Sequence, residues 1–236
     1  MKYLTPDEIK NNSKQIKSGF LRQAIDRPLS LKGECLGIFS RNVKELRKEE
    51  LKVLDFGTGS GGFLKGLNAM GYSRLYGCDI GDFVVDDIKP DLTDFRTFDA
   101  SFEKFPYKDE WFDAITAWEV FEHLENPHHA IREMHRILKP SGLLFVSMPN
   151  LFHLISRLVF LKSGLFPKWH EKNNHISLFP RGVFEKTFLR LFDLQEEGYS
   201  YPTILGFPRL QKISQHLPAN KWFGNWVYYV LRKKTV

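Results

Sequence analysis

Cysteine is almost absent from this sequence, which contains only Cys35 and Cys78 among its 236 residues. Two cysteines cannot form the framework of several disulfides that holds small secreted domains together. Cys78 also lies inside a predicted buried strand, next to Asp79. We therefore expect reduced cysteines and a cytoplasmic protein.

Long hydrophobic runs are absent as well. The first eight residues lack the apolar region of a signal peptide. The longest apolar region, residues 143–166, is interrupted by Pro149, Asn150, His153, Arg157 and Lys162. It falls short of the roughly 20 uninterrupted apolar residues that a membrane-spanning helix needs, so we expect no such helix. The sequence also lacks internal repeats and low-complexity segments.

What is present fits a globular protein, because 42% of the residues are hydrophobic and 26% are charged. The length predicts one domain with a full core, residues 1–236. The 21 phenylalanines predict a core or a binding pocket rich in aromatic rings. The net charge of +6 fits nucleic acid, anionic lipid or an acidic small molecule as a partner, and fits an ordinary basic enzyme equally well.

The chain is organised around residues 53–62, where a short apolar run passes into glycines and then into a helical pattern. Glycines at 57, 59 and 61 allow positive φ and close approach of a ligand to the backbone. The following helix offers unpaired N–H groups at its start, so the segment predicts a nucleotide-binding corner. Gly57, Gly59 and Gly62 also satisfy G-x-G-x-x-G, with Asp79 about twenty residues later, which leaves a dinucleotide as an alternative.

Strands and helices alternate through the middle of the chain. Strands are expected at residues 51–56, 74–79, 95–99, 112–118 and 143–148. Helices are expected after the glycine turn and after Asn126, and residues 81–94 leave room for a turn or two of helix at most. This alternation predicts parallel strands, joined by right-handed crossovers, in a doubly wound sheet. Ligands of such sheets bind at the carboxyl ends of the strands.

The N-terminal region departs from this alternation. Thr5-Pro6-Asp7-Glu8 has the features of a helix start, and the polar sequence that follows predicts a thin lid helix. Residues 22–35 are expected to form a loop. Phe39, Val43 and Leu46 then form one apolar stripe, which predicts a second helix that ends near Glu50.

The C-terminal region completes the predicted sheet. A helix is expected after Phe179-Pro180, and two further strands are expected near residues 194–201 and 225–231. The last strand is expected to be antiparallel. The predicted fold class is therefore α/β: a doubly wound, Rossmann-like, seven-stranded and mostly parallel sheet with one antiparallel terminal strand.

A series of short segments carries a family resemblance. Asp55 stands two positions before the first glycine of Val-Leu-Asp-Phe-Gly-Thr-Gly-Ser-Gly, where dinucleotide folds usually have a small apolar residue. Further segments follow in order: Tyr-Gly-Cys-Asp79, Phe-Asp99-Ala-Ser, Trp-Glu119-Val-Phe-Glu122-His123-Leu and Leu-Lys-Pro-Ser-Gly-Leu-Leu-Phe-Val-Ser. Over about residues 50–150 this series resembles the class I S-adenosylmethionine-dependent methyltransferases, of the type 11 and type 23 groups. It favours a methyltransferase over an NAD-binding oxidoreductase.

The resemblance implies four segments within one domain. Lid helices would occupy residues 1–50, a cofactor-binding core residues 51–150, an acceptor-side cap residues 151–193 and C-terminal strands residues 194–236. The cofactor would be S-adenosyl-L-methionine. Its binding residues would be Asp55, Gly57, Thr58, Gly59, Gly61, Asp79, Ile80, Asp99, Ala100 and Trp118.

The resemblance also implies a role for several of these residues. Asp79 would accept hydrogen bonds from the ribose hydroxyls, and Asp99 would accept one from the adenine amino group beside the Ala100 N–H. The glycine backbone would lie against the methionyl portion. Asp55 would orient the glycine loop, and the Trp118 carbonyl would meet the amino group of the ligand. Turn-capping carboxylates and a simple strand-to-helix turn remain open as alternatives.

Methyl transfer is an in-line displacement, in which an aromatic pocket with little water contributes mainly by positioning. A base is needed only where the acceptor is a neutral hydroxyl or amine. Three histidines could supply it: His123 after the fourth strand, His175 before the late helix, and His170 between them. His123 and His175 are the predicted catalytic residues, with orientation of the cofactor loop as the alternative for His123.

Glu119, Glu122 and His123 form the pattern E-x-x-E-H. On a helix they would share one face and could bind a hard cation. A similar pattern occurs in ubiquinone-biosynthesis O-methyltransferases, where it is linked to magnesium, but the same letters occur widely among methyltransferases that need no metal. We expect no metal.

The acceptor should lie beneath residues 1–45 and 150–224, where the resemblance ends. Residues 151–169 are apolar and basic, which predicts peripheral contact with an anionic membrane or the roof of a greasy pocket. A covered core helix explains the pattern almost as well. We therefore expect O-methylation of a small-molecule, lipid-linked, quinone-like or glycan-lipid acceptor.

Other function classes remain open. Nucleic acid is not expected as a partner, because Trp118-Glu119-Val120-Phe121 stands where a base-reading Asn-Pro-Pro-Tyr motif would follow the fourth strand. A protein methyltransferase and a cofactor-binding subunit without catalysis are further alternatives.

Overall fold

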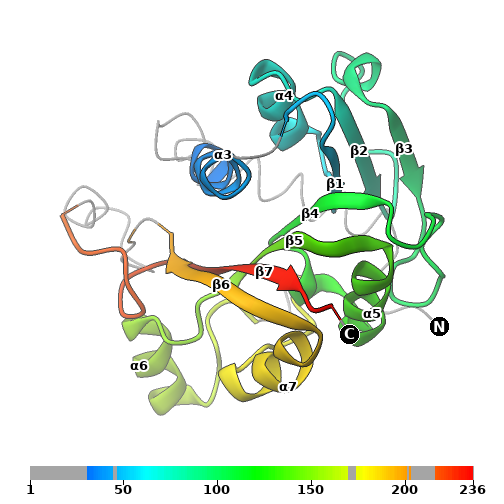
Figure 1. Ribbon diagram of the computed structural model, residues 1–236. Coiled ribbons are helices and arrows are strands. Elements are labelled where there is room, and N and C mark those ends of the chain that lie inside the picture. The colour runs from blue at the N-terminus through cyan, green and yellow to red at the C-terminus, as the bar shows by residue number, and fades with distance from the viewer. Residues whose placement is uncertain (1–30, 45–46, 170–173, 201, 203–215, 236) are drawn as a thin grey trace.

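A computed structural model describes residues 31–44, 47–169, 174–200, 202 and 216–235 (Figure 1). The predicted helix that begins at Thr5 lies outside these residues, as does His170. No helix in the described ranges is long and apolar enough to cross a membrane.

A seven-stranded sheet runs through the molecule in the order β3-β2-β1-β4-β5-β7-β6. Its strands are β1 Lys52–Phe56, β2 Arg74–Asp79, β3 Asp94–Thr97, β4 Phe112–Trp118, β5 Leu138–Pro149, β6 Phe192–Tyr199 and β7 Trp226–Lys233. The pairs among β1 to β5 are parallel, whereas β7 pairs antiparallel with both β5 and β6. The predicted seven-stranded, mostly parallel sheet with one antiparallel strand is confirmed.

The strand order creates a switch point between β1 and β4. From β1 the chain moves outward to β2 and β3, then returns to place β4 on the other side of β1. At such a point the connections leave the sheet in opposite directions, which opens a crevice at the carboxyl ends of the strands. Residues 56 and 78 are paired in the β1–β2 register, so the loops that follow both strands begin at the same edge.

Alternate strand residues pack on opposite faces of the sheet because successive side chains of a strand point in opposite directions. Val53, Ala114 and Phe145 pack beneath α3 (Leu31–Asn42) and α4 (Gly62–Ala69). Leu54, Ile115 and Leu144 pack on the other face with α5 (Pro127–Ile137) and α7 (Arg181–Leu191). The two layers of helices are visible above and below the sheet in Figure 1. Burial of both faces explains the continuous apolar runs of these strands.

The predicted bounds of several elements are wrong. Helix α3 begins at Leu31, inside the predicted loop 22–35, and ends at Asn42 rather than near Glu50. Its buried stripe contains Cys35, which behaves as a small apolar residue here and lies four positions before Phe39.

Strand β5 begins at Leu138, where Lys139-Pro140-Ser141-Gly142 was expected only to end the preceding helix. Leu138 continues the sheet because it pairs with Phe112 of β4. Strand β3 ends at Thr97, before the predicted limit at Asp99. The expectation for residues 81–94 is confirmed by a single 3-10 turn, η1 (Lys89–Asp91).

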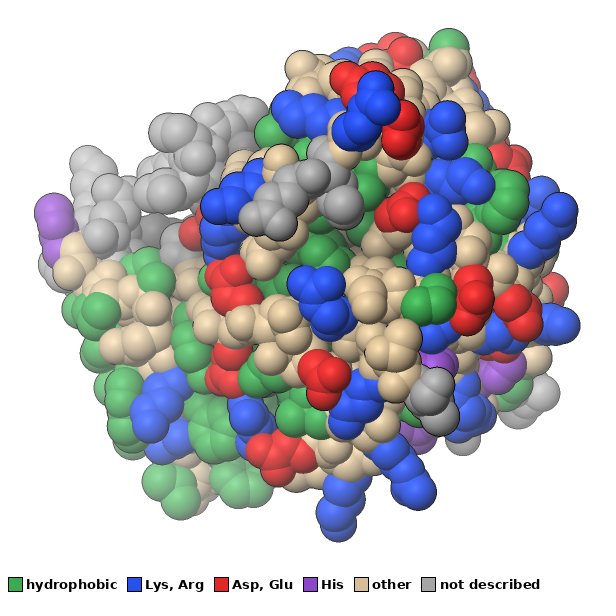
Figure 2. Space-filling model, in the orientation of Figure 1, with side chains coloured by type: hydrophobic (Ala, Val, Ile, Leu, Met, Phe, Trp, Pro, Cys, Tyr) green, Lys and Arg blue, Asp and Glu red, His purple; other side chains and the backbone are tan. Residues whose placement is uncertain are grey.

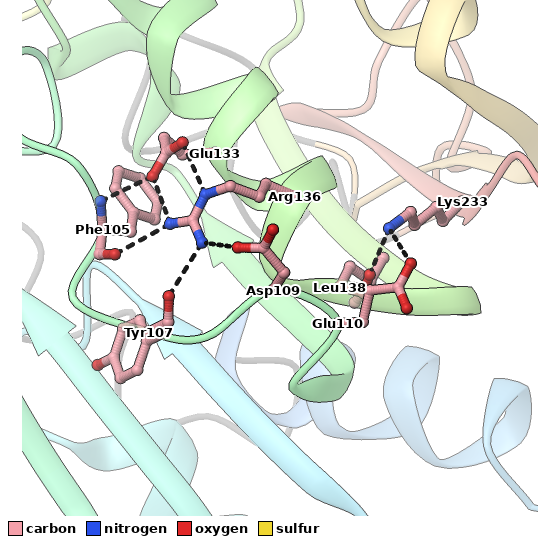
Figure 3. A network of polar contacts seen from close by, with 8 residues as sticks. All are labelled: Phe105, Tyr107, Asp109, Glu110, Glu133, Arg136, Leu138 and Lys233. Carbon is pink, nitrogen blue, oxygen red and sulfur yellow. Dashed lines mark hydrogen bonds and ion pairs between the residues drawn. The ribbon is translucent and has the colours of Figure 1, made fainter. Parts of the chain in front are cut away.

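A polar network connects α5 to the loop between β3 and β4 (Figure 3). The Arg136 guanidinium donates to the carbonyl oxygens of Phe105 and Tyr107, each at 3.0 Å, and forms ion pairs with Asp109 and Glu133. The Glu133 carboxylate accepts from the Phe105 N–H at 2.8 Å. This network holds Phe105, whose ring stacks on Phe56 at 5.5 Å, against the carboxyl end of β1.

Candidate cofactor and catalytic site

A cavity of about 230 Å³ lies at the carboxyl ends of β1, β2 and β4, at the switch point of the sheet. Its walls come from the glycine turn, the two loops that follow β2 and β3, the segment after β4, and one residue from the acceptor side. The lining residues are Phe56, Gly57, Gly59, Asp79, Ile80, Phe98, Asp99, Ala100, Ser101, Glu119, Val120, His123, Leu124, Glu125 and Asn174.

The glycine turn adopts the backbone that its sequence predicts. Gly57, Gly59 and Gly61 have φ values of 75°, 54° and 84°. A Cβ on Gly57 would meet the Val120 side chain at 2.5 Å, so this glycine is needed for close packing. A Cβ on Gly59 would meet no atom within 4 Å, and Gly59 lines the cavity. The turn therefore presents bare backbone to open space, as a bound ligand would require.

Asp79 lies at the tip of β2 and joins the β2 edge to the glycine turn. Its carboxylate accepts from the Gly59 N–H at 2.8 Å and from the Ile80 N–H at 2.7 Å. Burial raises the pKa of Asp79, and the two backbone hydrogen bonds oppose this rise. Each carboxylate oxygen has a second lone pair, so this fixed group can also accept from a ligand hydroxyl.

Asp99 and Ala100 line the cavity from the loop after β3. The Asp99 carboxylate accepts from the Ser101 N–H at 3.0 Å, and the Asp99 backbone N–H donates to the Glu103 carboxylate at 2.9 Å. Both Asp79 and Asp99 thus cap the turns that follow them, as the alternative interpretation expected, and both face one cavity. The two roles coexist, because capping uses only part of the accepting capacity of a carboxylate.

Four predicted cofactor residues do not line the cavity: Asp55, Thr58, Gly61 and Trp118. Asp55 is buried beneath the turn, where it accepts from the Thr116 hydroxyl at 2.7 Å, and burial raises its pKa to about 7. The Thr58 hydroxyl donates to the Asp55 carbonyl oxygen at 2.7 Å and accepts from the Cys78 N–H at 3.0 Å. These contacts support the turn from below. Gly61 precedes the first residue of α4, and the Trp118 ring packs on Phe63 at 5.9 Å.

His123 lines the cavity and has a defined tautomer. Its Nδ1 lies 3.0 Å from the Asn174 carbonyl oxygen. Because a carbonyl only accepts, Nδ1 carries the hydrogen and Nε2 keeps the lone pair in the neutral ring. Burial lowers the pKa of His123, which favours the neutral form. His175 packs on His123 with ring centroids 4.7 Å apart but does not line the cavity.

Two glutamates lie beside His123. Glu119 has a positive φ of 54° and lines the cavity. Its N–H donates to the Ser147 hydroxyl at 3.0 Å, and that hydroxyl donates back to the Glu119 carboxylate at 3.1 Å. Glu122 is buried, and its carboxylate oxygens have no hydrogen-bond partner within the described part of the chain. Burial raises the pKa of both carboxyls, for Glu122 to about 8, and lowers the pKa of Lys168 to about 8.

The segment after β4 is not the helix on which a metal site of Glu119, Glu122 and His123 would depend. Residues Phe121–His123 form one 3-10 turn, η2, and Glu119 precedes it, so Glu119, Glu122 and His123 do not share a helix face. The fold instead brings one ligand atom each of Glu122, His123 and His175 within 4.8 Å of one another. A carboxylate and two imidazoles are groups that bind divalent cations, so these three residues could hold one.

Several lining residues were not predicted as site residues. Phe98, Ser101, Val120, Leu124 and Glu125 lie within two positions of predicted site residues in the sequence, and the lining role of such neighbours could have been anticipated. Asn174 stands next to the predicted catalytic residue His175 and reaches the cavity from a segment about 50 residues away, through its hydrogen bond with His123. The Ile176 and Ser177 N–H groups also donate to the Glu122 carbonyl oxygen, at 2.7 and 2.9 Å, which fastens this segment to the turn after β4.

The family model for the methyltransferase domain matches residues 29–195, more than half of the chain. The chain belongs to the class I methyltransferase family. The match contains the methyltransferase cavity and all of its lining residues.

Curated relatives of this methyltransferase include ubiquinone biosynthesis O-methyltransferases. The one from Pseudomonas fluorescens is 29% identical over 202 residues, which cover 78% of this chain and 79% of the relative. The mitochondrial one from Dictyostelium discoideum is 28% identical over 127 residues, 47% of this chain and 39% of the relative. In several of these matches the chain spans less than half of the relative's length, and a glycine/sarcosine/dimethylglycine N-methyltransferase from Actinopolyspora halophila is matched over 19% of its length.

Solved structures share the methyltransferase fold at low sequence identity. An S-adenosylmethionine-dependent methyltransferase from Mesorhizobium loti has a TM-score of 0.58 and 15% identity, over 86% of this chain and 97% of that one. The [4+2]-cyclase SpnF has a TM-score of 0.60 and 17% identity, over 86% of this chain and 82% of that one. Because a cyclase shares the fold, the reaction has to be argued from the site.

Proposed function

We propose that this protein transfers a methyl group from S-adenosyl-L-methionine to a hydroxyl oxygen of a small-molecule, lipid-linked or glycan acceptor. The observation that carries the proposal is the meeting of two carboxylates, Asp79 and Asp99, with the bare backbone of Gly59 around one cavity. Relatives that bear the name O-methyltransferase support oxygen as the methylated atom.

The residues present fit the cofactor. Asp79 at the tip of β2 can accept from vicinal ribose hydroxyls, while Ile80 and Phe98 offer apolar surface to an adenine ring. Asp99 can accept from the adenine amino group, and the methionyl portion would lie along Gly57 and Gly59. When bound, the cofactor supplies a methyl group on a cationic sulfonium.

The chain's own residues would position the acceptor and remove its proton. Because the Nδ1–H of His123 donates to the Asn174 carbonyl oxygen, Nε2 carries the lone pair that could accept the proton of the acceptor hydroxyl. Val120 and Leu124 line the same cavity and would shield the reacting atoms from water. Since burial lowers the pKa of His123, methyl transfer should fall on the acid side with an apparent pKa below the ordinary imidazole value of about 6.5.

Two measurements on the purified chain test this function. Calorimetric titration with S-adenosylhomocysteine should show one binding site, whereas titration with NAD should show none. Incubation with methyl-labelled S-adenosylmethionine and a total lipid extract should move label into an organic-soluble product that gains one methyl mass and resists hydrolysis as an ether does. Absence of S-adenosylhomocysteine binding by the folded chain would overturn the cofactor assignment. Label found only on nitrogen or carbon would overturn O-methylation.

A further inference from the structure

Helix α6 (Leu154–Ser163) turns its apolar side chains outward. Leu154, Leu158 and Leu161 recur at the spacing of one helix face and are 36%, 54% and 81% exposed. Leu165, just past the helix end, is 63% exposed, and Ser156 is the buried residue of the helix. A helix that covers a core would have the opposite orientation, so the covered-core interpretation of this segment is wrong.

The outward orientation is built into the backbone. His153 caps the helix by accepting from the Ile155 N–H at 3.2 Å, and it is itself buried. The Leu154 N–H donates to the Trp222 carbonyl oxygen at 2.8 Å. The Asn150 amide donates to the carbonyl oxygens of Lys221 and Gly224, at 3.0 and 2.8 Å. These bonds fasten α6 to the segment before β7, so the two segments form one surface.

This surface continues onto residues 216–225, where Trp222 is 38% exposed. The Arg157 guanidinium lies over the Phe152 ring at 4.9 Å and over the Trp222 ring at 4.5 Å, which joins the two segments through cation–π contacts. Phe152 and Phe160 are each 43% exposed. Hydrophobic side chains gather over α6 at the lower left of Figure 2, with basic side chains beside them.

The charge of this surface has one sign. The sequence contains no Asp or Glu from residue 134 to 170, nor from residue 198 to the end. Both segments of the surface fall within these acid-free stretches. Lys162 and Lys221 are exposed beside the apolar side chains. Within these two segments every charged side chain is cationic, and an apolar face that carries cationic groups complements the boundary between acyl chains and anionic headgroups.

We propose that α6 and residues 216–225 form a docking surface for an anionic phospholipid bilayer. A second copy of the chain fits less well, because a symmetric dimer through this face would set Arg157, Lys162 and Lys221 against the same cations of its partner. Helix α6 follows the carboxyl end of β5, and β5 is parallel to β4, so the surface lies at the same end of the sheet as the cavity.

Sedimentation of the full chain with vesicles tests the surface without any assay of methyl transfer. The chain should bind vesicles that contain phosphatidylglycerol, bind phosphatidylcholine vesicles at least about tenfold more weakly, and bind less at high salt. The double variant Leu158→Ser, Leu161→Ser should lose at least about tenfold in affinity for the anionic vesicles. Lys162→Glu with Lys221→Glu should weaken the same binding by about tenfold or more.

Val85→Ser is the matched control, because Val85 is an apolar side chain 45% exposed on the connection between β2 and β3. It should bind like the wild type, and all variants should keep the wild-type melting temperature and S-adenosylhomocysteine affinity. Absence of vesicle binding, equal binding to both vesicle types, or full binding by the leucine variant would overturn the proposal. A wild-type dimer in light scattering, together with monomeric leucine variants and no vesicle binding, would assign the surface to self-association and also overturn it.

Discussion

Helices α5 and α6 are nearly equal in length, 11 and 10 residues, but their apolar side chains point in opposite directions, inward in α5 and outward in α6. Helix α5 buries Ala130, Ile131, Met134 and Ile137 against the sheet. Helix α6 buries Ser156 and exposes its leucines. The connection explains the difference: α5 joins two parallel strands and must cross the sheet face, whereas α6 leaves the end of β5 and is held at the side by backbone hydrogen bonds.

The contrast extends to the regions that the two helices represent. The region from β1 to β5 places carboxylates and a histidine around the cavity at its strand ends, and these groups can bind a cofactor and accept a proton. The α6 region, with residues 216–225, carries no acidic residue and offers apolar and cationic side chains to the outside. From the two proposals we infer that the region from β1 to β5 performs the reaction and that the α6 region places the protein at the membrane.

The largest effect should come from His123→Ala, which should separate the two regions. Removal of the base should lower the rate of methyl transfer by about 10²- to 10⁴-fold. Vesicle binding and S-adenosylhomocysteine affinity should stay within about threefold of the wild type, because neither depends on Nε2 of this ring. The three quantities are measured by label transfer, sedimentation and calorimetry. An unchanged transfer rate would remove His123 from the mechanism.

A matched pair of truncations should lower the free energy of unfolding to different extents in the two helices. Met134→Ala in α5 should lower the free energy of unfolding by about 2–5 kcal/mol, since it leaves a cavity in a fully buried site. Leu161→Ala in α6 should change it by less than about 0.5 kcal/mol, because that side chain is 81% exposed. Urea unfolding measures both values. Equal losses would mean that the α6 leucines are covered within the folded chain.

Asp55→Asn should remove the pH dependence of the free energy of unfolding that arises from the carboxyl buried beneath the glycine turn. Burial raises the folded pKa of Asp55 to about 7, so the folded state binds a proton that the unfolded state releases near pH 4. Stability from this group is therefore full below about pH 4 and is lost progressively as the pH rises to about 7. Relative to the Asn variant, the wild type should lose about 2–3 kcal/mol between pH 5 and pH 8. Parallel unfolding curves at the two pH values would contradict the burial of a protonated carboxyl.

The strand-tip region was predictable from the sequence because its signals are local. The positive φ of Gly57, Gly59 and Gly61 follows from the glycine spacing, and the positions of Asp79 and Asp99 follow from the ends of apolar strands. The hydrogen bond that the His123 Nδ1–H donates to the Asn174 carbonyl oxygen depends on tertiary contact between distant segments.

The orientation of α6 was left open by its sequence for a similar reason. An apolar stripe predicts that one face of a helix is apolar, but it does not predict whether that face points inward or outward. In α6 the hydrogen bonds to Lys221, Trp222 and Gly224 fix the helix with its apolar face outward. Helix α3 begins inside the predicted loop 22–35 because the buried Cys35 extends its apolar stripe toward the N-terminus.

The cofactor site is tested most simply by calorimetry, which compares the affinity for S-adenosylhomocysteine between the wild type and the double variant Asp79→Ala, Asp99→Ala. The double variant should lose at least about 100-fold in affinity, because each carboxylate would contribute charge-assisted hydrogen bonds to the nucleoside. Asp86→Ala is the control, since the Asp86 side chain is 100% exposed, and it should bind like the wild type. A folded double variant with wild-type affinity would contradict the cofactor site and the function derived from it.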